Sequence, residues 1–63
     1  MHNQETTMNV YRVKVGHAEV IVKAMSAEEA IACARRQLAQ EMPRFYDIIR
    51  GLDPTRFEVR QAA

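Results

Sequence analysis

Most of the architecture follows from residues 10–31, which read VYRVKVGHAEVIVKAMSAEEAI. From Val10 to Ala24, apolar and polar residues alternate, which is the pattern of a strand with one buried face. After Ser26 the apolar residues recur at helical spacing as far as Met42. This change of period predicts a β-hairpin that runs into an amphipathic helix.

The hairpin is predicted from two strands, residues 10–15 and 18–24, joined by Gly16 and His17. Glycine at the first central position suits a type II′ turn, because that position needs a positive φ. A shift of one residue would turn the apolar side chains to the opposite face, so the register is well specified. In this register one face of the sheet carries Tyr11, Val13, Val15, Ala18, Val20 and Val22.

The helix is expected to begin with a capping box at residues 26–29. In this motif the Ser26 hydroxyl accepts from the Glu29 amide, and the Glu29 carboxylate accepts from the Ser26 amide. The stripe expected to face the core contains Ala27, Ile31, Ala34, Leu38 and Met42. The side expected to point away contains Ala32, Cys33, Arg36, Ala39 and Gln40.

A short second helix is predicted over residues 43–50, because Pro43 blocks continuation of the first helix. Its one-sided spacing places Phe45, Ile48 and Ile49 against the end of the core. Tyr46 then lies off that stripe and is expected to be exposed beside Arg50.

A turn at residues 52–55 leads to a third predicted strand, residues 56–61, with Phe57 and Val59 pointing inward. The fold class is therefore α+β: a ββαβ domain over residues 10–61, with a disordered tail over residues 1–9. A right-handed crossover places the third strand beside the first. The expected sheet has three antiparallel strands in order 2-1-3, with the helix on one face.

Length and composition favour self-association. A single domain of 63 residues buries a small share of its surface and commonly relies on disulfides, a metal or oligomerisation. One cysteine excludes an internal disulfide, and no Cys/His cluster predicts a metal site or a cofactor. The supplement that remains is a homo-oligomer, most simply a homodimer.

Charge and hydropathy narrow the classes of function. Nine Lys and Arg stand against eight Asp and Glu, which is not the footprint of a strong nucleic-acid binder. No stretch is long and apolar enough to cross a bilayer, and the N-terminus lacks the pattern of a signal peptide. We therefore expect a cytoplasmic protein, to which the lone Cys33 is suited.

The first half resembles a group of small bacterial and phage proteins, including the DpnD/PcfM-like proteins. The resemblance rests on Tyr11-Arg12-Val13-Lys14-Val15 and on the helix start Ser26-Ala27-Glu28-Glu29-Ala30-Ile31. It covers less than half of the chain and implies a bacterial or phage origin, but no activity and no functional residues.

The sheet face opposite the helix is the principal candidate site. It is expected to display Val10, Arg12, Lys14, Glu19, Ile21, Lys23, Arg56, Glu58 and Arg60. Three interpretations remain open. The face is solvated, with cross-strand pairs Lys14–Glu19 and Glu58–Arg12; it is an interface for a second copy or a protein partner; or it is a platform for RNA or single-stranded DNA, although it lacks aromatic side chains.

Catalysis is not predicted. His17 stands at the hairpin tip without an expected partner, and Cys33 has no histidine nearby to activate it. We therefore interpret the chain as a small non-enzymatic interaction protein that self-associates and binds a protein partner, with weak nucleic-acid binding as the alternative. The candidate contact residues are Val10, Arg12, Lys14, Ile21, Lys23, Tyr46, Arg56 and Arg60.

Overall fold

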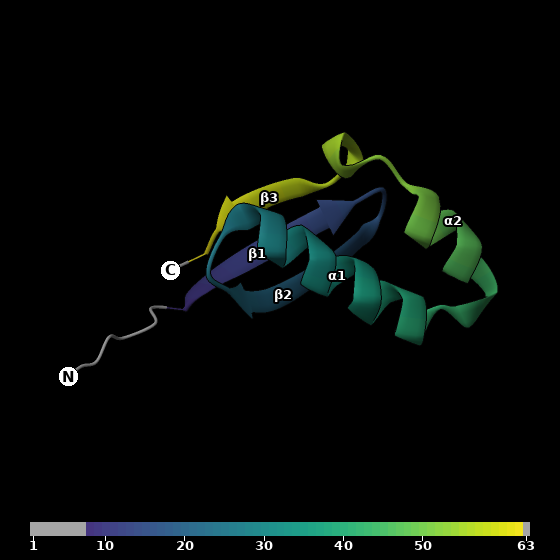
Figure 1. Cartoon of the computed structure of the whole chain (residues 1–63), viewed down its shortest axis with the longest axis horizontal. Helices are drawn as coiled ribbons and strands as arrows, with labels where there is room; N and C mark the ends of the chain where they lie inside the picture. Colours follow the sequence, from purple (N-terminus) through teal and green to yellow (C-terminus); the bar gives the residue numbers. More distant parts are fainter. Residues whose placement is uncertain (1–7, 63) are drawn as a thin grey trace.

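In the computed structural model, which describes residues 8–62, a three-stranded antiparallel sheet in the order β2-β1-β3 is covered on one face by α1 (Figure 1). The predicted fold class and strand order are confirmed. The elements follow the chain as β1 (Asn9–Val15), β2 (Ala18–Ala24), α1 (Ala27–Glu41), η1 (Pro43–Phe45), α2 (Tyr46–Gly51), η2 (Pro54–Arg56) and β3 (Glu58–Gln61). Strand β1 thus includes Asn9, the last residue of the predicted tail, and residues 1–7 lie outside the described part.

The hairpin forms in the predicted register. Val15 pairs with Ala18, and Val13 pairs with Val20, across the turn that begins at Gly16. The φ of Gly16 is 58°, in the region that only glycine enters at little cost. The two-residue connection therefore fixes which side chains share a face.

The core lies between the sheet and α1. The buried hydrophobic residues come from every strand and both α-helices or their flanks, and Val13 is the most completely buried large one at 1% exposure. They are Tyr11, Val13, Val20, Val22, Ala24, Ala30, Ala34, Leu38, Ala39, Ile49 and Phe57. Because four of them are alanines, α1 lies close to the sheet, mostly over β2.

The start of α1 matches half of the expected capping box. The Ser26 hydroxyl accepts from the Glu29 amide at 3.1 Å, as predicted. The Glu29 carboxylate, however, accepts from the amide of Met25 at 2.6 Å, one residue before the expected donor. The Glu29 amide is a donor of the first helical turn, which has no partner within the helix, whereas the Met25 amide precedes the N-cap.

The core-facing stripe of α1 differs from the expected one at its two ends. Ala27 is exposed and Ala30 is buried instead, while Ala39, expected to face away, is buried. Helix α2 packs against α1 (Figure 1), and Ala39 lines the groove between the two helices with Tyr46 and Arg50, which accounts for the second difference.

The second helical segment is present, but its expected packing was wrong. Of its apolar residues only Ile49 is buried, whereas Phe45 is 49% and Ile48 is 62% exposed. The segment begins as the 3₁₀ turn η1 and becomes α-helical only at Tyr46. Because a 3₁₀ turn has three residues per turn, the change of helix type takes Phe45 off the face that carries Ile49.

Candidate functional site

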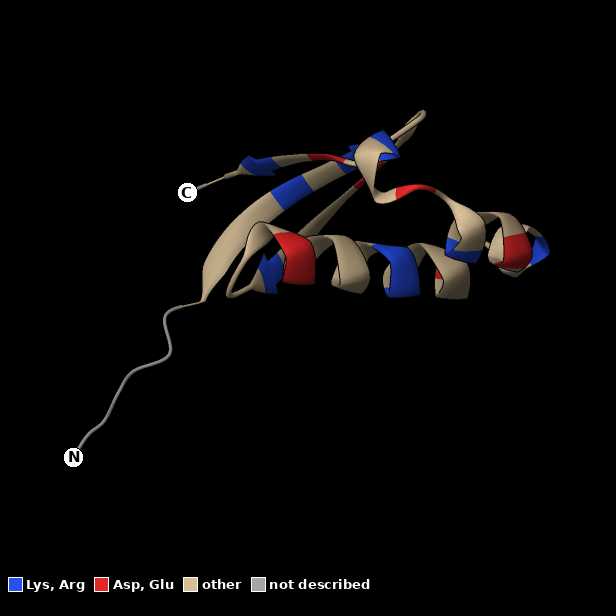
Figure 2. Cartoon of the chain, turned by 45° about the horizontal axis from the view of Figure 1, so that its top comes forward, with Lys and Arg blue, Asp and Glu red and all other residues tan. Residues whose placement is uncertain are grey.

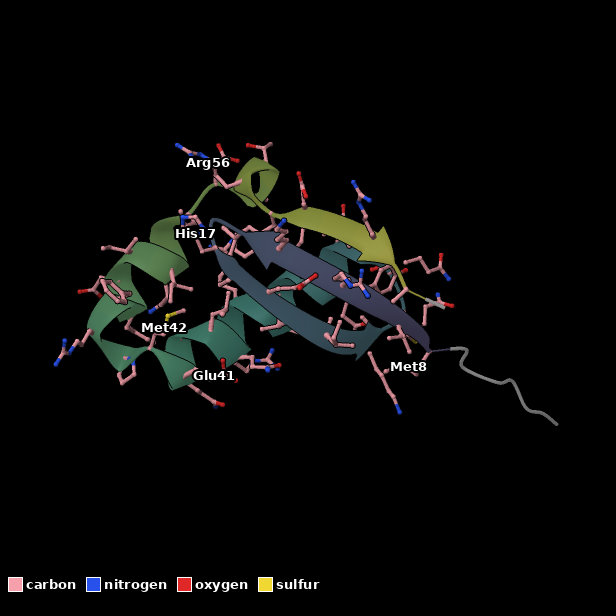
Figure 3. All side chains as sticks on the ribbon, turned by 180° about the vertical axis from the view of Figure 1, so that it is seen from behind. Met8, His17, Glu41, Met42 and Arg56 are labelled. Carbon is pink, nitrogen blue, oxygen red and sulfur yellow. The ribbon has the colours of Figure 1, made fainter. Side chains whose placement is uncertain are left out.

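The sheet face opposite α1 is bare in the described part of the chain, and Figure 3 views it directly. Alternation along β1 and β2 points every second side chain to this open sheet face. Ile21 is 54% exposed, and Val10, its diagonal neighbour across the β1–β2 pair, is half-buried. The charged residues on the face, all exposed, are Arg12, Lys14, Glu19, Lys23, Glu58 and Arg60.

Two predicted contact residues lie elsewhere. Arg56 belongs to η2, because the Asp53 side chain accepts from the amide and the hydroxyl of Thr55, both at 3.0 Å, and so initiates a 3₁₀ turn. Pairing with β1 begins only at Glu58, so the expected start of the third strand was wrong by two residues. Arg56 lies outside the paired strands (Figure 3), although it lines a hollow with Lys14 and Glu58 at the edge of the open sheet face. Tyr46 lies on α2, away from that face.

The open sheet face carries a positive surplus. Arg12, Lys14, Lys23 and Arg60 stand against two acids, which leaves two positive charges uncompensated. The ion pair found on it joins Arg12 Nε to Glu19 Oε2 at 3.2 Å, a diagonal pair in place of the two expected pairs. With side chains 57% and 47% exposed, this pair contributes less than about 1 kcal/mol to stability.

A second surface is the groove between α1 and α2, about 460 Å³ in volume. Tyr46 is 46% exposed beside Arg50, as predicted, with 3.3 Å between Arg50 Nη1 and the Tyr46 hydroxyl oxygen. The Arg50 guanidinium also lies 5.5 Å from the centre of the Tyr46 ring. The groove is lined by Ala32, Arg35, Arg36, Ala39, Gln40, Tyr46 and Arg50. Its charged lining is entirely basic.

Arg35 has a role that the sequence did not reveal. Its Nη1 donates to the carbonyl oxygens of Ile49 at 2.8 Å, Arg50 at 3.1 Å and Leu52 at 2.9 Å. These carbonyls lie at the C-terminal end of α2, where helical carbonyls lack their usual donors, and the one at Ile49 also accepts from the Leu52 amide at 3.3 Å. The guanidinium also lies 5.0 Å from the centre of the Phe57 ring. The signal in the sequence that could have indicated this role was the position of Arg35, a charged residue that borders the apolar stripe of α1.

A third surface is an apolar groove between the hairpin tip and α2, about 320 Å³ in volume. The exposed side chains of Phe45 and Ile48 line it on the α2 side, and Val15 and Ala18 line it on the hairpin side. Figure 3 shows His17 and Met42 at this end of the molecule. The groove exists because the second helical segment leaves two of its three large apolar side chains outside the core.

The residues with reactive or titratable side chains are scattered over the structure. His17 is exposed at the hairpin tip, and Cys33 is half-buried against the core. Hydrogen bonds from Thr55, and to a lesser degree the charge of Arg56, lower the pKa of Asp53. Among residues 8–62, no three His, Cys, Asp or Glu side chains gather closely enough to hold a metal ion.

Figure 2 shows acidic and basic residues distributed over both the strands and the helices. None of the helices within residues 8–62 combines the length and the apolar character required to cross a bilayer. Comparison with known proteins returned no match, whether to a family model, a curated protein or a solved structure.

Proposed function

We propose that this protein is a non-enzymatic interaction protein whose open sheet face binds an acidic surface of a protein partner. The observation that carries the proposal is the composition of that face. An exposed Ile21 and a half-buried Val10 lie among four basic and two acidic side chains. An apolar centre with an arginine-containing charged rim is the usual anatomy of a protein interface.

The positive surplus argues for a partner of opposite charge. Two copies stacked through this same face would bring four uncompensated positive charges together, two from each, which disfavours such a dimer. An acidic partner would instead be attracted over a distance and oriented by the basic residues. The partner chemistry that fits is therefore a carboxylate-rich protein surface with an apolar residue at its centre.

Nucleic acid fits the same face less well. Proteins that bind single strands combine basic grooves with aromatic side chains on which the bases stack. The exposed side chains of the open sheet face are charged or aliphatic, and the exposed aromatics Phe45 and Tyr46 belong to η1 and α2 and not to the sheet. Nucleic-acid binding is thus the outcome that would count against the proposal.

The proposal is tested by fluorescence anisotropy with a labelled oligoglutamate peptide that carries a central leucine. The variant Lys14→Gln with Arg60→Gln removes two charges from the open sheet face. The control variant Arg36→Gln with Arg44→Gln removes two charges from exposed helical positions. We expect the first variant to bind about tenfold more weakly and the control to stay within about twofold of the unmodified protein.

Two outcomes would contradict the proposal. Equal losses in both variants would mean that net charge, and not this face, attracts the peptide. Tighter binding of an oligothymidine strand than of the peptide, with the steep salt dependence of phosphate contacts, would establish the nucleic-acid alternative.

A further inference from the structure

Strand β2 is a seven-residue strand at the border of the sheet, with β1 on one side and no described strand on the other (Figure 1). Neighbouring residues of a strand direct their backbone groups to opposite sides. The Ala62 amide donates to the Val10 carbonyl at 2.7 Å, so Val10 directs its backbone groups toward the β3 side of β1. Tyr11 and Val13 therefore direct theirs toward β2.

This alternation identifies the unpaired backbone groups of β2. Val22 and Val20 lie opposite Tyr11 and Val13 and turn their amides and carbonyls toward β1. The residues that lie between and beside Val20 and Val22 direct their amides and carbonyls outward, away from β1. The outward residues are Glu19, Ile21 and Lys23.

We propose that two copies of this chain pair antiparallel through β2, with Ile21 of one copy opposite Ile21 of the other. A two-fold axis at Ile21 places Glu19 of each copy opposite Lys23 of the second copy. All three outward residues of each strand then meet outward residues of the partner, so every free amide and carbonyl in this stretch gains a hydrogen-bond partner. The same register joins two opposite-charge pairs on either side of an apolar pair.

The charges of this edge are complementary to themselves. A lysine on an edge strand usually discourages pairing with other chains. Lys23 discourages pairing with a strand that places a basic or apolar residue opposite it. In the symmetric register, however, Lys23 lies opposite Glu19 of the second copy. The pattern therefore favours a second copy over an unrelated strand.

The surroundings of β2 leave room for the second copy. An open groove of about 470 Å³ runs between this edge and α1, and both Ile21 and Lys23 line it. Seen from behind, β2 forms one border of the sheet, with α1 on the far side of the strands (Figure 3). The other edge strand, β3, has four residues and offers a shorter stretch for pairing.

Pairing through β2 produces one six-stranded sheet with both α1 helices on the same face. The open sheet faces of the two copies become continuous, so this inference extends the proposed function without depending on it. Pairing brings Glu19, which lies 3.2 Å from Arg12 in the single chain, next to Lys23 of the second copy. Arg12, Lys14 and Arg60 then remain as the basic residues of the enlarged face.

Charge reversal tests the register, with sedimentation equilibrium as the measurement. Glu19→Lys or Lys23→Glu alone replaces both ion pairs by like-charge pairs, and we expect the dimer dissociation constant to rise at least about tenfold. The double variant Glu19→Lys with Lys23→Glu restores both pairs in the reverse sense and regains dimerisation. An equimolar mixture of the two single variants forms a mixed dimer for the same reason. Glu58→Lys on β3 is the control and leaves the dissociation constant unchanged within about twofold.

Amide hydrogen exchange provides a second readout. In the dimer the Ile21 amide is hydrogen-bonded across the new strand pair, so it exchanges more slowly at high than at low protein concentration, while the Gln61 amide on β3 does not change. A chain that stays monomeric up to about 1 mM would overturn the inference. So would a dimer that the single reversals leave intact. A dimer strengthened by Lys14→Gln with Arg60→Gln, and unaffected by Glu19→Lys, would instead indicate pairing through the open sheet face, because these changes relieve the repulsion between the two basic faces.

Discussion

The hairpin with the first half of α1 and the segment from Pro43 to Phe57 are built on different principles. In the hairpin, alternation places apolar side chains in one buried layer, and Val13 is 1% exposed. In the later segment three large side chains, Phe45, Tyr46 and Ile48, are exposed, and Arg35 donates to three carbonyls at the C-terminal end of α2. The first region is held by many small contacts, whereas the second depends heavily on one polar side chain.

This difference has a consequence for function. A region held by buried apolar layers presents a rigid outer face, which suits the open sheet face as a binding surface. A region held by one arginine, with Phe45 and Ile48 exposed, opens at a lower cost in free energy than the hairpin. Three pairs of substitutions measure the contrast.

A large effect is expected in the hairpin. Val13→Ala removes two methylene-sized groups from the most buried large side chain and leaves a cavity under α1. We expect the free energy of unfolding to fall by about 2–3 kcal/mol, measured by urea denaturation followed with circular dichroism. Val10→Ala, on the same strand but on the open sheet face, serves as the control and should cost less than about 1 kcal/mol. Equal losses would mean that the two faces of β1 are buried alike.

A smaller and more local effect is expected for Arg35→Met. This change keeps a long side chain beside Phe57 but removes the Arg35 donor from the Arg50 and Leu52 carbonyls, while the Ile49 carbonyl keeps the Leu52 amide. We expect a loss of about 1–3 kcal/mol, and faster hydrogen exchange at the Leu52 amide than at Val20.

The neighbouring Arg36, which is exposed, provides the control for that experiment. Arg36→Met should change the free energy of unfolding by less than about 0.5 kcal/mol. If Arg35→Met accelerated exchange equally in β2 and α2, the two regions would unfold as one unit and the contrast between them would fail.

Local patterns were sufficient to predict the first region. The register followed from a two-residue turn with glycine in first place, and the helix start followed from Ser26 and Glu29, which lie three residues apart. The open face of the sheet could also be predicted from the sequence, because the alternation along two strands gives only one apolar face. The open positions of Arg12 and Ile21 were therefore predictable from the sequence.

The errors have two sources: docking between distant residues, and local turns that the apolar pattern does not show. The burial of Ala39 depends on the docking of α2, and that docking depends on Arg35 reaching carbonyls 14 to 17 residues away. The position of Arg56 depends on a 3₁₀ turn that Asp53 caps, which delays the start of β3. The diagonal Arg12–Glu19 pair depends on side-chain reach, which strand pairing alone does not specify.

The smallest effect is expected at Ile48, and the neighbouring Ile49 provides a matched comparison on the same helix. Ile48 is 62% exposed and Ile49 is 5% exposed, so the same change to serine samples opposite sides of α2. Ile48→Ser should alter the free energy of unfolding by less than about 0.5 kcal/mol, whereas Ile49→Ser should cost about 3 kcal/mol. Urea denaturation of both variants at low protein concentration, where a second copy contributes little, provides the measurement. A loss at Ile48 as large as that at Ile49 would mean that α2 buries both sides in solution, and the apolar groove beside the hairpin tip would then be closed.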